Sequence, residues 1–255
     1  MIRLNKRQQF ILDEIESQKF VEVNTLGEKL TVSAVTIRKD LKFLEDKGLL
    51  YRTHGGASKE SQYAFERNIN EKEFVQVPQK KKIAEEALKF INNDDFIILA
   101  SGTSIHYLAR VIKGFKKLTV VTPALRVSME LSKDPFIDVI QLGGTLRKSS
   151  ISVIGIIPET DLRDFSCNKL FLGVDGIDVN YGLTTSNASE AHLNQVMIES
   201  SEKVIVLADS TKINKRGFGK ICDIDKVDAL ITDSGILAED LETFEGRGIE
   251  VIVAR

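Results

Sequence analysis

The sequence predicts two domains of different architecture. The first is an α+β domain with the outline of a helix-turn-helix followed by a β-wing, and the second is an α/β domain with a mostly parallel sheet. Two observations predict this division: short helical patterns and a double glycine fill residues 1–58, and strands alternate with helices over residues 80–255. Residues 59–79 are polar without clear periodicity, which predicts a linker.

Composition places the chain among ordinary globular proteins. It has 255 residues, of which 42% are hydrophobic and 28% are charged. Its two cysteines, Cys167 and Cys222, lie far apart, so we expect no disulfide framework, no metal site and no cofactor. No apolar run approaches the roughly 18 residues of a membrane span, and the first residues lack the apolar core of a secretion signal. A cytoplasmic protein with no membrane partner is therefore expected.

The net charge of −2 is divided unevenly. Residues 1–58 hold ten Lys or Arg and eight Asp or Glu, whereas the rest of the chain holds twenty-five and twenty-nine. This asymmetry is too mild to indicate a nucleic-acid partner, so any prediction of one must rest on where the charges are placed rather than on their sum.

Three short helices are predicted in the first domain. Apolar residues recur at helical spacing in residues 7–19, and a second helix follows at residues 25–30 with Asn24 as its N-cap. A third begins after Ser33 as N-cap and ends at Gly48. This succession is the outline of a helix-turn-helix.

The polar face of the third helix suggests what it contacts. Opposite an apolar stripe, this face carries small polar and basic side chains: Ser33, Thr36, Arg38, Lys39 and Lys42. A helix that enters the major groove of DNA needs such a face, although an ordinary amphipathic surface helix shows it too. An extended stretch with Arg52 and His54 follows and ends in Gly55-Gly56, which suits a wing lying against phosphates and so favours DNA.

The motifs of this region carry a family resemblance. VSAVTIRKDL at residues 32–41, Leu44-Glu45, Gly48-Leu49 and RTHGGA at residues 52–57 closely resemble the DNA-binding signature of the DeoR family of bacterial transcriptional regulators. The resemblance implies a winged helix-turn-helix that binds operator double-stranded DNA, with residues 33–42 in the major groove. Asp40 is expected to pair with a local basic or backbone group, because a carboxylate against phosphate is unfavourable.

Seven apolar runs of buried-strand length predict the sheet of the second domain, with helical patterns between many of them, including residues 104–112 and 124–131. The runs are residues 96–100, 118–122, 137–142, 170–174, 204–208, 229–232 and 249–253. Such alternation predicts a mostly parallel sheet covered by helices on both faces.

Small, hydroxylated or charged residues follow these strands, at the edge where open α/β sheets bind ligands. Ser101-Gly102-Thr103-Ser104 comes directly before a helix, so free backbone N–H groups and hydroxyls can cradle a phosphate there, and Lys212 can add a point charge. Each loop alone uses residues typical of any turn, and only their conjunction favours a site.

The resemblance to the DeoR family covers this domain too. It rests on Gly143-Gly144 with Arg147, FLGVDGID at residues 171–178, GLTT at 182–185 followed by Glu190, and DSTK at 209–212. It implies a fold similar to ribose-5-phosphate isomerase and a phosphorylated sugar or polyol as effector. The implied effector-binding set is Ser101, Gly102, Thr103, Ser104, Gly143, Gly144, Arg147, Asp175, Glu190 and Lys212. Thr122-Pro123 departs from the family's usual Thr-Asn, which removes a side-chain amide and a backbone donor.

Three functions remain open for such a chain. It is a repressor of a carbohydrate-catabolism operon, acting as a homodimer or homotetramer that a phosphorylated sugar releases from DNA; or an isomerase-like enzyme; or a constitutive DNA binder with a degenerate site. Asp175, Glu190 and Lys212 suit isomerisation, but the acidic cluster that such isomerases carry after the matching Asp-Gly is absent, and His54, His106 and His192 are isolated. The attached DNA-binding motif favours the repressor, with no catalytic residue.

Overall fold

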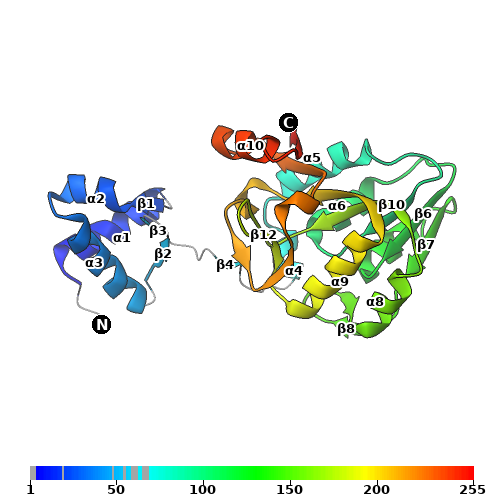
Figure 1. Cartoon of the computed structure of the whole chain (residues 1–255), viewed down its shortest axis with the longest axis horizontal. Coiled ribbons are helices and arrows are strands. Elements are labelled where there is room, and N and C mark those ends of the chain that lie inside the picture. Colours follow the sequence, from blue (N-terminus) through cyan, green and yellow to red (C-terminus); the bar gives the residue numbers. More distant parts are fainter. Residues whose placement is uncertain (1–3, 19, 48, 54–55, 59–62, 65–68) are drawn as a thin grey trace. The chain divides into compact units, whose positions relative to one another are not determined.

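The computed structural model describes residues 4–18, 20–47, 49–53, 56–58, 63–64 and 69–255 of the chain. It divides into two compact units, unit 1 at residues 1–62 and unit 2 at residues 63–255 (Figure 1).

Unit 1 consists of three helices and a small antiparallel sheet. The helices are α1 (Lys6–Gln18), α2 (Val23–Leu30) and α3 (Ala34–Asp46), and the strands are β1 (Phe20–Glu22), β2 (Tyr51–Thr53) and β3 (Gly56–Ser58), in the order β1-β3-β2. Its core includes Ile11, Ile37 and Leu41, each at most 1% exposed. Ser33 caps α3 as predicted, because its hydroxyl accepts a hydrogen bond from the Thr36 amide.

One predicted helix start in unit 1 is wrong. α2 begins at Val23 with Glu22 at the N-cap position, and Asn24 lies inside the helix. The reason is that β1 pairs with β3 and runs directly into α2, while the buried Val23 packs in the core. This strand of three residues is too short to show a period in the sequence.

A seven-stranded parallel sheet organises unit 2 and contains all seven apolar runs predicted as strands. Its strands are β5 (Phe96–Leu99), β6 (Leu118–Thr122), β7 (Ile137–Gln141), β10 (Cys167–Gly173), β13 (Ser201–Leu207), β16 (Ala229–Asp233) and β17 (Glu250–Ala254), in the order β17-β16-β13-β10-β5-β6-β7. Consecutive residues of one strand, such as Leu170 and Phe171, point to opposite faces and enter different cores, so the sheet is buried on both faces.

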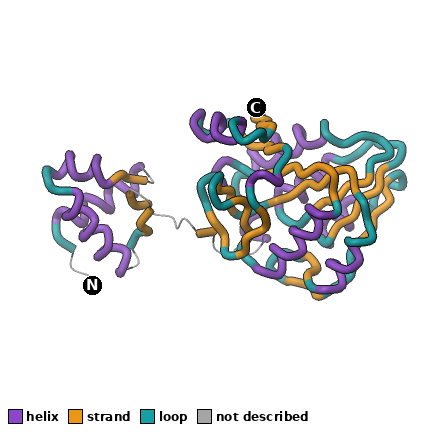
Figure 2. The backbone as a smooth tube through the Cα atoms, viewed as in Figure 1, coloured by secondary structure: helices purple, strands orange, loops and turns teal. Residues whose placement is uncertain are grey.

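Helices cover both faces of this sheet (Figure 2). One core takes residues of α5 (Val77–Leu88), α6 (Thr103–Val111) and α7 (Leu125–Leu131). The other takes residues of α8 (Ile156–Leu162), α9 (Ala188–Glu199) and α10 (Ala238–Glu245). The fold class predicted from the sequence is therefore confirmed: a winged helix-turn-helix followed by an α/β domain.

Several short elements of unit 2 have no counterpart in the sequence prediction. They are the sheet β11 (Gly176–Asp178), β12 (Gly182–Thr185) and β15 (Gly219–Cys222), the hairpin β8 (Thr145–Arg147) and β9 (Ser152–Ile154), the pair β4 (Tyr63–Ala64) and β14 (Arg216–Gly217), and the 3-10 turns η1 (Ser210–Lys212) and η2 (Ile224–Lys226). Gly182 starts β12 at φ 99°, and a Cβ there would lie 2.0 Å from the carbonyl oxygen of Cys222. The close approach of these strands therefore requires glycine.

The segment expected as a linker, residues 59–79, includes ordered structure. It holds β4, the short helix α4 (Ile69–Glu73) and the first turn of α5. Ion pairs help to fix α4, since the carboxylate of Glu73 contacts Arg110 at 2.9 Å and Arg126 at 2.7 Å. A helix that is held by ion pairs needs few apolar residues, so residues 59–79 show no apolar periodicity. For this reason the sequence predicted a linker.

No helix in the described ranges is long and apolar enough to span a membrane. Among the same residues, no group of three or more His, Cys, Asp or Glu side chains is arranged to hold a metal ion.

Candidate functional site

The strand order places a switch point between β5 and β10. From β5 the chain continues to β6 and β7 on one side of the sheet, and from β10 it continues to β13, β16 and β17 on the other. Ligands of open α/β sheets bind at such a point, outside the carboxyl ends of the strands. Ser101 lies at the end of β5 and Asp175 at the end of β10. A Cβ at Gly173 would lie 3.0 Å from the carbonyl oxygen of Ser101, so glycine lets the two ends approach each other.

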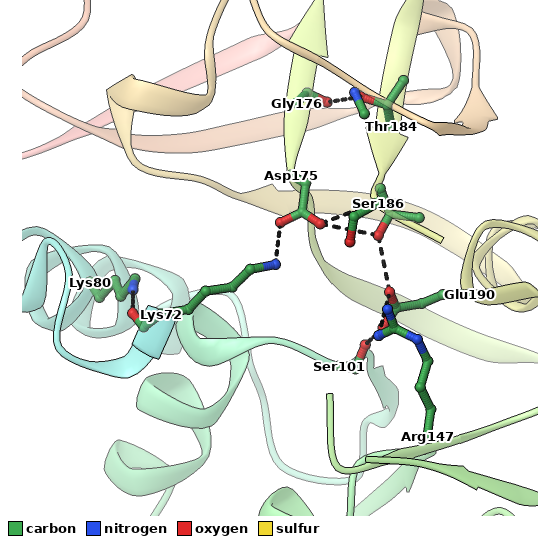
Figure 3. A network of polar contacts seen from close by, with 11 residues as sticks. Lys72, Lys80, Ser101, Arg147, Asp175, Gly176, Thr184, Ser186 and Glu190 are labelled. Atoms are coloured by element: carbon green, nitrogen blue, oxygen red, sulfur yellow. Dashed lines mark hydrogen bonds and ion pairs between the residues drawn. The ribbon is translucent and has the colours of Figure 1, made fainter. Parts of the chain in front are cut away.

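A connected polar network surrounds this point, and we call it the strand-end site (Figure 3). Its charged members come from five elements or loops of unit 2: Lys72, Lys80, Arg147, Asp175 and Glu190. We count Lys212 with the site because its charge acts on Asp175, although it makes no hydrogen bond to the network among the described residues. The hydroxyl of Thr185 links its two carboxylates, with Oγ1 at 3.4 Å from Asp175 Oδ2 and 3.1 Å from Glu190 Oε2.

Asp175 is a buried carboxylate with all its described partners inside unit 2. The Lys72 ammonium donates to Oδ1 at 2.6 Å, and the Ser186 amide donates to Oδ2 at 3.1 Å. Burial alone raises the pKa of Asp175, but the charges of Lys72 and Lys212 and the hydrogen bonds from Lys72 and Ser186 outweigh it and hold the pKa below its usual value. Asp175 is therefore an anion and a hydrogen-bond acceptor at neutral pH.

Glu190 lies in the first turn of α9, whose N-cap Asn187 accepts a hydrogen bond from the Glu190 amide. Its Oε1 accepts a hydrogen bond from the Ser101 hydroxyl at 2.9 Å, and Arg147 Nη1 lies 3.5 Å from Oε2. Glu190 thereby connects the end of β5 with the β8–β9 hairpin.

Buried and half-buried lysines give the strand-end site an excess of positive charge close to Asp175. Lys80 is 4% exposed and donates to the carbonyl oxygens of Lys72 and Val75, and burial lowers its pKa to about 8. Burial also lowers the pKa of Lys212, against the opposing effect of Asp175 and Asp209. Among the described residues, none makes a hydrogen bond or ion pair with the Lys212 ammonium. An anion at this point would satisfy these lysines.

The loop at residues 101–104 adds backbone donors. Gly102 precedes α6 at φ 120°, and no atom lies within 4 Å of the position a Cβ would take there. The first amides of α6 have no partners within the helix, and Thr103 and Ser104 lie among them. On the far side, Asp233 accepts hydrogen bonds from the amide and hydroxyl of Ser210 and so fixes the loop that carries Lys212.

The second candidate surface is the outer face of α3 in unit 1, which we call the α3 face. Ser33, Arg38, Lys39 and Lys42 are exposed on it, and Thr36 is half-buried with its hydroxyl 3.0 Å from that of Ser33. No ion pair of Arg38, Lys39 or Lys42 occurs among the described residues. Asp40 is buried and pairs with Arg7 of α1, as expected for a structural carboxylate.

Comparison with known proteins assigns both units to one family. Residues 7–62 match the model of the DeoR-like helix-turn-helix domain, and residues 75–234 match the DeoR C terminal sensor domain. The chain belongs to the DeoR family. It is 37% identical to the uncharacterized HTH-type transcriptional regulator YulB of Bacillus subtilis, over 96% of this chain and 95% of that protein.

Two further relatives of this DeoR-family regulator carry more specific names. The lactose phosphotransferase system repressor of Staphylococcus epidermidis is 32% identical over 94% of this chain and 97% of that protein. The HTH-type transcriptional regulator GlpR of Haloferax volcanii is 31% identical over 97% and 96%. All three relatives are regulators by name. Among solved structures, a D-ribose-5-phosphate isomerase in complex with phospho-erythronic acid aligns with 52% of each chain at 21% identity and a TM-score of 0.40.

The structure brings together much of the set expected at the sensor site, but not all of it. Ser101, Arg147, Asp175 and Glu190 belong to one network. The two glycines expected at the site, Gly143 and Gly144, are exposed instead. A Cβ on Gly144 would lie 2.9 Å from Pro158 Cδ. Packing against α8 is therefore the observed reason for glycine at 144.

Pro123 and His106, which the sequence also singled out, make other contacts. Pro123 is used in backbone pairing, because its carbonyl accepts a hydrogen bond from the Val153 amide at 2.9 Å. His106 is buried 3.9 Å from Glu73, where burial and Arg110 lower its pKa. Arg52 lies in β2, and His54 lies outside the described residues.

Sequence reasoning missed Lys72, Lys80 and Thr185. Lys80 had a detectable signal, because it shares a helix face with Ile83, Ala84 and Ala87. A lysine on such an apolar face is rare unless its ammonium group has polar partners. Lys72 had none, since it lies on a short polar helix 103 residues before Asp175.

Proposed function

We propose that this DeoR-family regulator represses an operon of carbohydrate catabolism and that a phosphorylated sugar or polyol at the strand-end site releases it from operator DNA. The observation that carries the proposal is the half-buried ammonium of Lys212, which makes no hydrogen bond or ion pair with any described residue and lies close to two acceptor carboxylates at the switch point. A compound with one phosphate and several hydroxyls matches that combination of charges. The names of the relatives support sugar metabolism as the regulated process.

The residues divide into two tasks at the strand-end site. The phosphate would take the amides and hydroxyls of Ser101, Gly102, Thr103 and Ser104 together with Lys212. The sugar hydroxyls would donate to Asp175 and Glu190, and Arg147 would hold Glu190 in place. Gly143 and Gly144 would shape the neighbouring turn rather than contact the ligand.

The α3 face would supply the contacts to DNA. Ser33, Thr36, Arg38, Lys39 and Lys42 would enter the major groove, and Arg52 and His54 of the wing would lie against the phosphate backbone. A homodimer or homotetramer would place one recognition helix on each half-site of a symmetric operator. A coupling free energy of about 1 to 3 kcal/mol between ligand and DNA would give about 5- to 150-fold release.

The charge state of Asp175 argues against isomerase chemistry. A general base works best with a pKa near the operating pH. The pKa of Asp175 is instead held below its usual value, and Lys72 occupies one of its oxygens. The relatives, as named regulators, point the same way.

Fluorescence anisotropy tests the proposal directly. The full-length protein is titrated onto labelled DNA from upstream of its own operon, at fixed salt because phosphate contacts depend steeply on ionic strength. Ribose 5-phosphate, fructose 1-phosphate, fructose 6-phosphate, glucose 6-phosphate and glycerol 3-phosphate are then added, each beside its unphosphorylated parent. We expect release by a phosphorylated compound and not by its parent. Specific binding that no compound shifts would indicate a constitutive DNA binder.

A further inference from the structure

The segment that enters unit 2 is fastened to the strand-end site by its first helix. Among the described residues, α4 is the first helix of unit 2 along the chain, so it follows the connection from the DNA-binding unit. It is anchored by Glu73, which pairs with Arg110 and Arg126, and by the Ile69 amide, which donates to the Ser149 carbonyl at 2.7 Å.

Two lysines of the strand-end site also hold α4 in place (Figure 3). Lys72 projects from α4 and donates to Asp175 at 2.6 Å, with side chains 24% and 10% exposed. Lys80 donates to the carbonyl oxygens of Lys72 and Val75 at 2.6 and 2.7 Å, and these groups lie at the carboxyl end of α4. The position of α4 therefore depends on charges that the proposed ligand would also contact.

The strand before α4 is attached to the same region. β4 pairs in parallel with β14, which follows Lys212 closely in the chain, and Ile213 forms a bridge with Ile177 beside Asp175. Both elements through which the chain enters unit 2 are thus linked to loops that carry site residues.

We propose that α4 is a latch displaced by the ligand: Lys72 closes on Asp175 while the strand-end site is empty, and its release shifts the segment that leads to the DNA-binding unit. This inference rests on the proposed function and names its regulation. A sugar hydroxyl that donates to Asp175 Oδ1 competes there with Lys72, from which that oxygen accepts a hydrogen bond at 2.6 Å. A phosphate dianion nearby attracts the ammonium groups of Lys72 and Lys80 away from their present acceptors. Ligand and latch compete for the same groups, which is the differential interaction that coupling requires.

The test uses the full-length protein on operator DNA without any added ligand. Lys72→Met removes the charge and keeps the length of the side chain, so it opens the latch. We expect it to weaken operator binding about five- to tenfold, in the direction in which the sugar phosphate acts on the wild type. Asp175→Asn should give a similar loss, and the double variant should lose no more than either single one, since both break one contact. Lys72→Arg should keep most of the affinity.

Lys89→Met is the matched control, because Lys89 forms an exposed ion pair with Glu86 outside the strand-end site. We expect it to bind DNA like the wild type. Hydrogen exchange of the amides of residues 69–76 provides a second readout, with faster exchange in Lys72→Met than in Lys89→Met.

Failure of the latch and failure of the proposed function give different results. Lys72→Met with unchanged DNA affinity, unchanged exchange and normal release by the sugar phosphate overturns the latch and leaves the proposed function standing. A wild type that no sugar phosphate releases, together with weakened DNA binding by Lys72→Met, overturns the proposed effector while the latch stands.

Discussion

The α3 face and the strand-end site both present cations suited to phosphate, and they keep those cations in opposite ways. Arg38, Lys39 and Lys42 are exposed, so water solvates them. In the strand-end site the charges are buried or half-buried, and Lys72, Asp175 and Glu190 already hold partners from within the chain. A buried charge without a partner is costly, whereas an exposed one is not. Under the proposed function, groups of the chain itself thus occupy the positions of the ligand while it is absent, and the exposed α3 face needs no such partners.

The largest effect that tests this contrast is expected from Glu190→Gln. In Glu190 both carboxylate oxygens accept hydrogen bonds, Oε1 from the Ser101 hydroxyl and Oε2 from the Thr185 hydroxyl beside Arg147. The side-chain amide of the variant would keep only one acceptor oxygen, so one of these donors would lose its partner. Buried donors left unsatisfied should lower the free energy of unfolding by about 3 kcal/mol. For a domain of this size, that is about 6 to 12 °C in the midpoint of thermal unfolding of unit 2, measured by calorimetry.

Glu202→Gln is the control for this substitution, because Glu202 is an exposed carboxylate of unit 2. Its unfolding should match that of the wild type. If Glu190→Gln were equally stable, the network of the strand-end site would contribute nothing to folding, and the contrast with the α3 face would fail.

Arg38→Ala should show the reverse pattern, with a loss of binding and none of stability. Arg38 is exposed and no described residue pairs with it, so the free energy of unfolding should change by less than about 0.5 kcal/mol. Operator affinity should fall by about 2 kcal/mol, about thirtyfold, with relaxed preference for the operator sequence if Arg38 contacts a base edge.

Lys29→Ala provides the matched comparison in unit 1, since Lys29 is already neutralised by Glu14 at 2.6 Å. It should bind the operator nearly as well as the wild type in the same anisotropy assay. Unchanged binding by Arg38→Ala would remove this side chain from the interface.

The same contrast explains what the sequence could predict. The α3 face comes from ten consecutive residues, so helical periodicity and the Ser33 cap sufficed. The seven strands are mostly continuous apolar runs, and the residues after them pointed to Ser101, Asp175 and Lys212. Glu190 was expected only from the family resemblance. Lys72 could not be predicted in this way. Its place beside Asp175 depends on how α4 packs on Arg110 and Arg126, a tertiary arrangement of polar groups with no local pattern.

A third prediction concerns pH and Lys80. Burial lowers the pKa of Lys80 from 10.5 to about 8, so its charge is lost as the pH rises through that value. A bound phosphate stays dianionic in this range, because its second pKa is about 6. The affinity for the releasing sugar phosphate should therefore fall, by up to about tenfold per pH unit, above about pH 8. Isothermal titration calorimetry at a series of pH values would measure this fall.

The stability of unit 2 provides the internal check on that fall. The unfolded chain binds more protons at residue 80 than the folded one between about pH 8 and 10.5, so the contribution of Lys80 to folding rises with pH in this window. Ligand affinity and this contribution thus change in opposite directions, whereas general loss of structure would lower both. In Lys80→Met the Lys80-dependent part of the pH profile should vanish, and an unaltered profile would assign the fall to another group.

The smallest effect is expected from Lys42→Ala. Lys42 lies one turn beyond Arg38 on the exposed side of α3, and its flexible ammonium suits a phosphate rather than a base edge. Its removal should weaken binding to operator and unrelated duplexes alike and should reduce the slope of log affinity against log salt by about 1. Anisotropy titrations at several salt concentrations measure both quantities, with Lys29→Ala again as the control. A loss of affinity for the operator alone would instead indicate that Lys42 contacts a base edge. Base contacts would then extend beyond the first turns of α3.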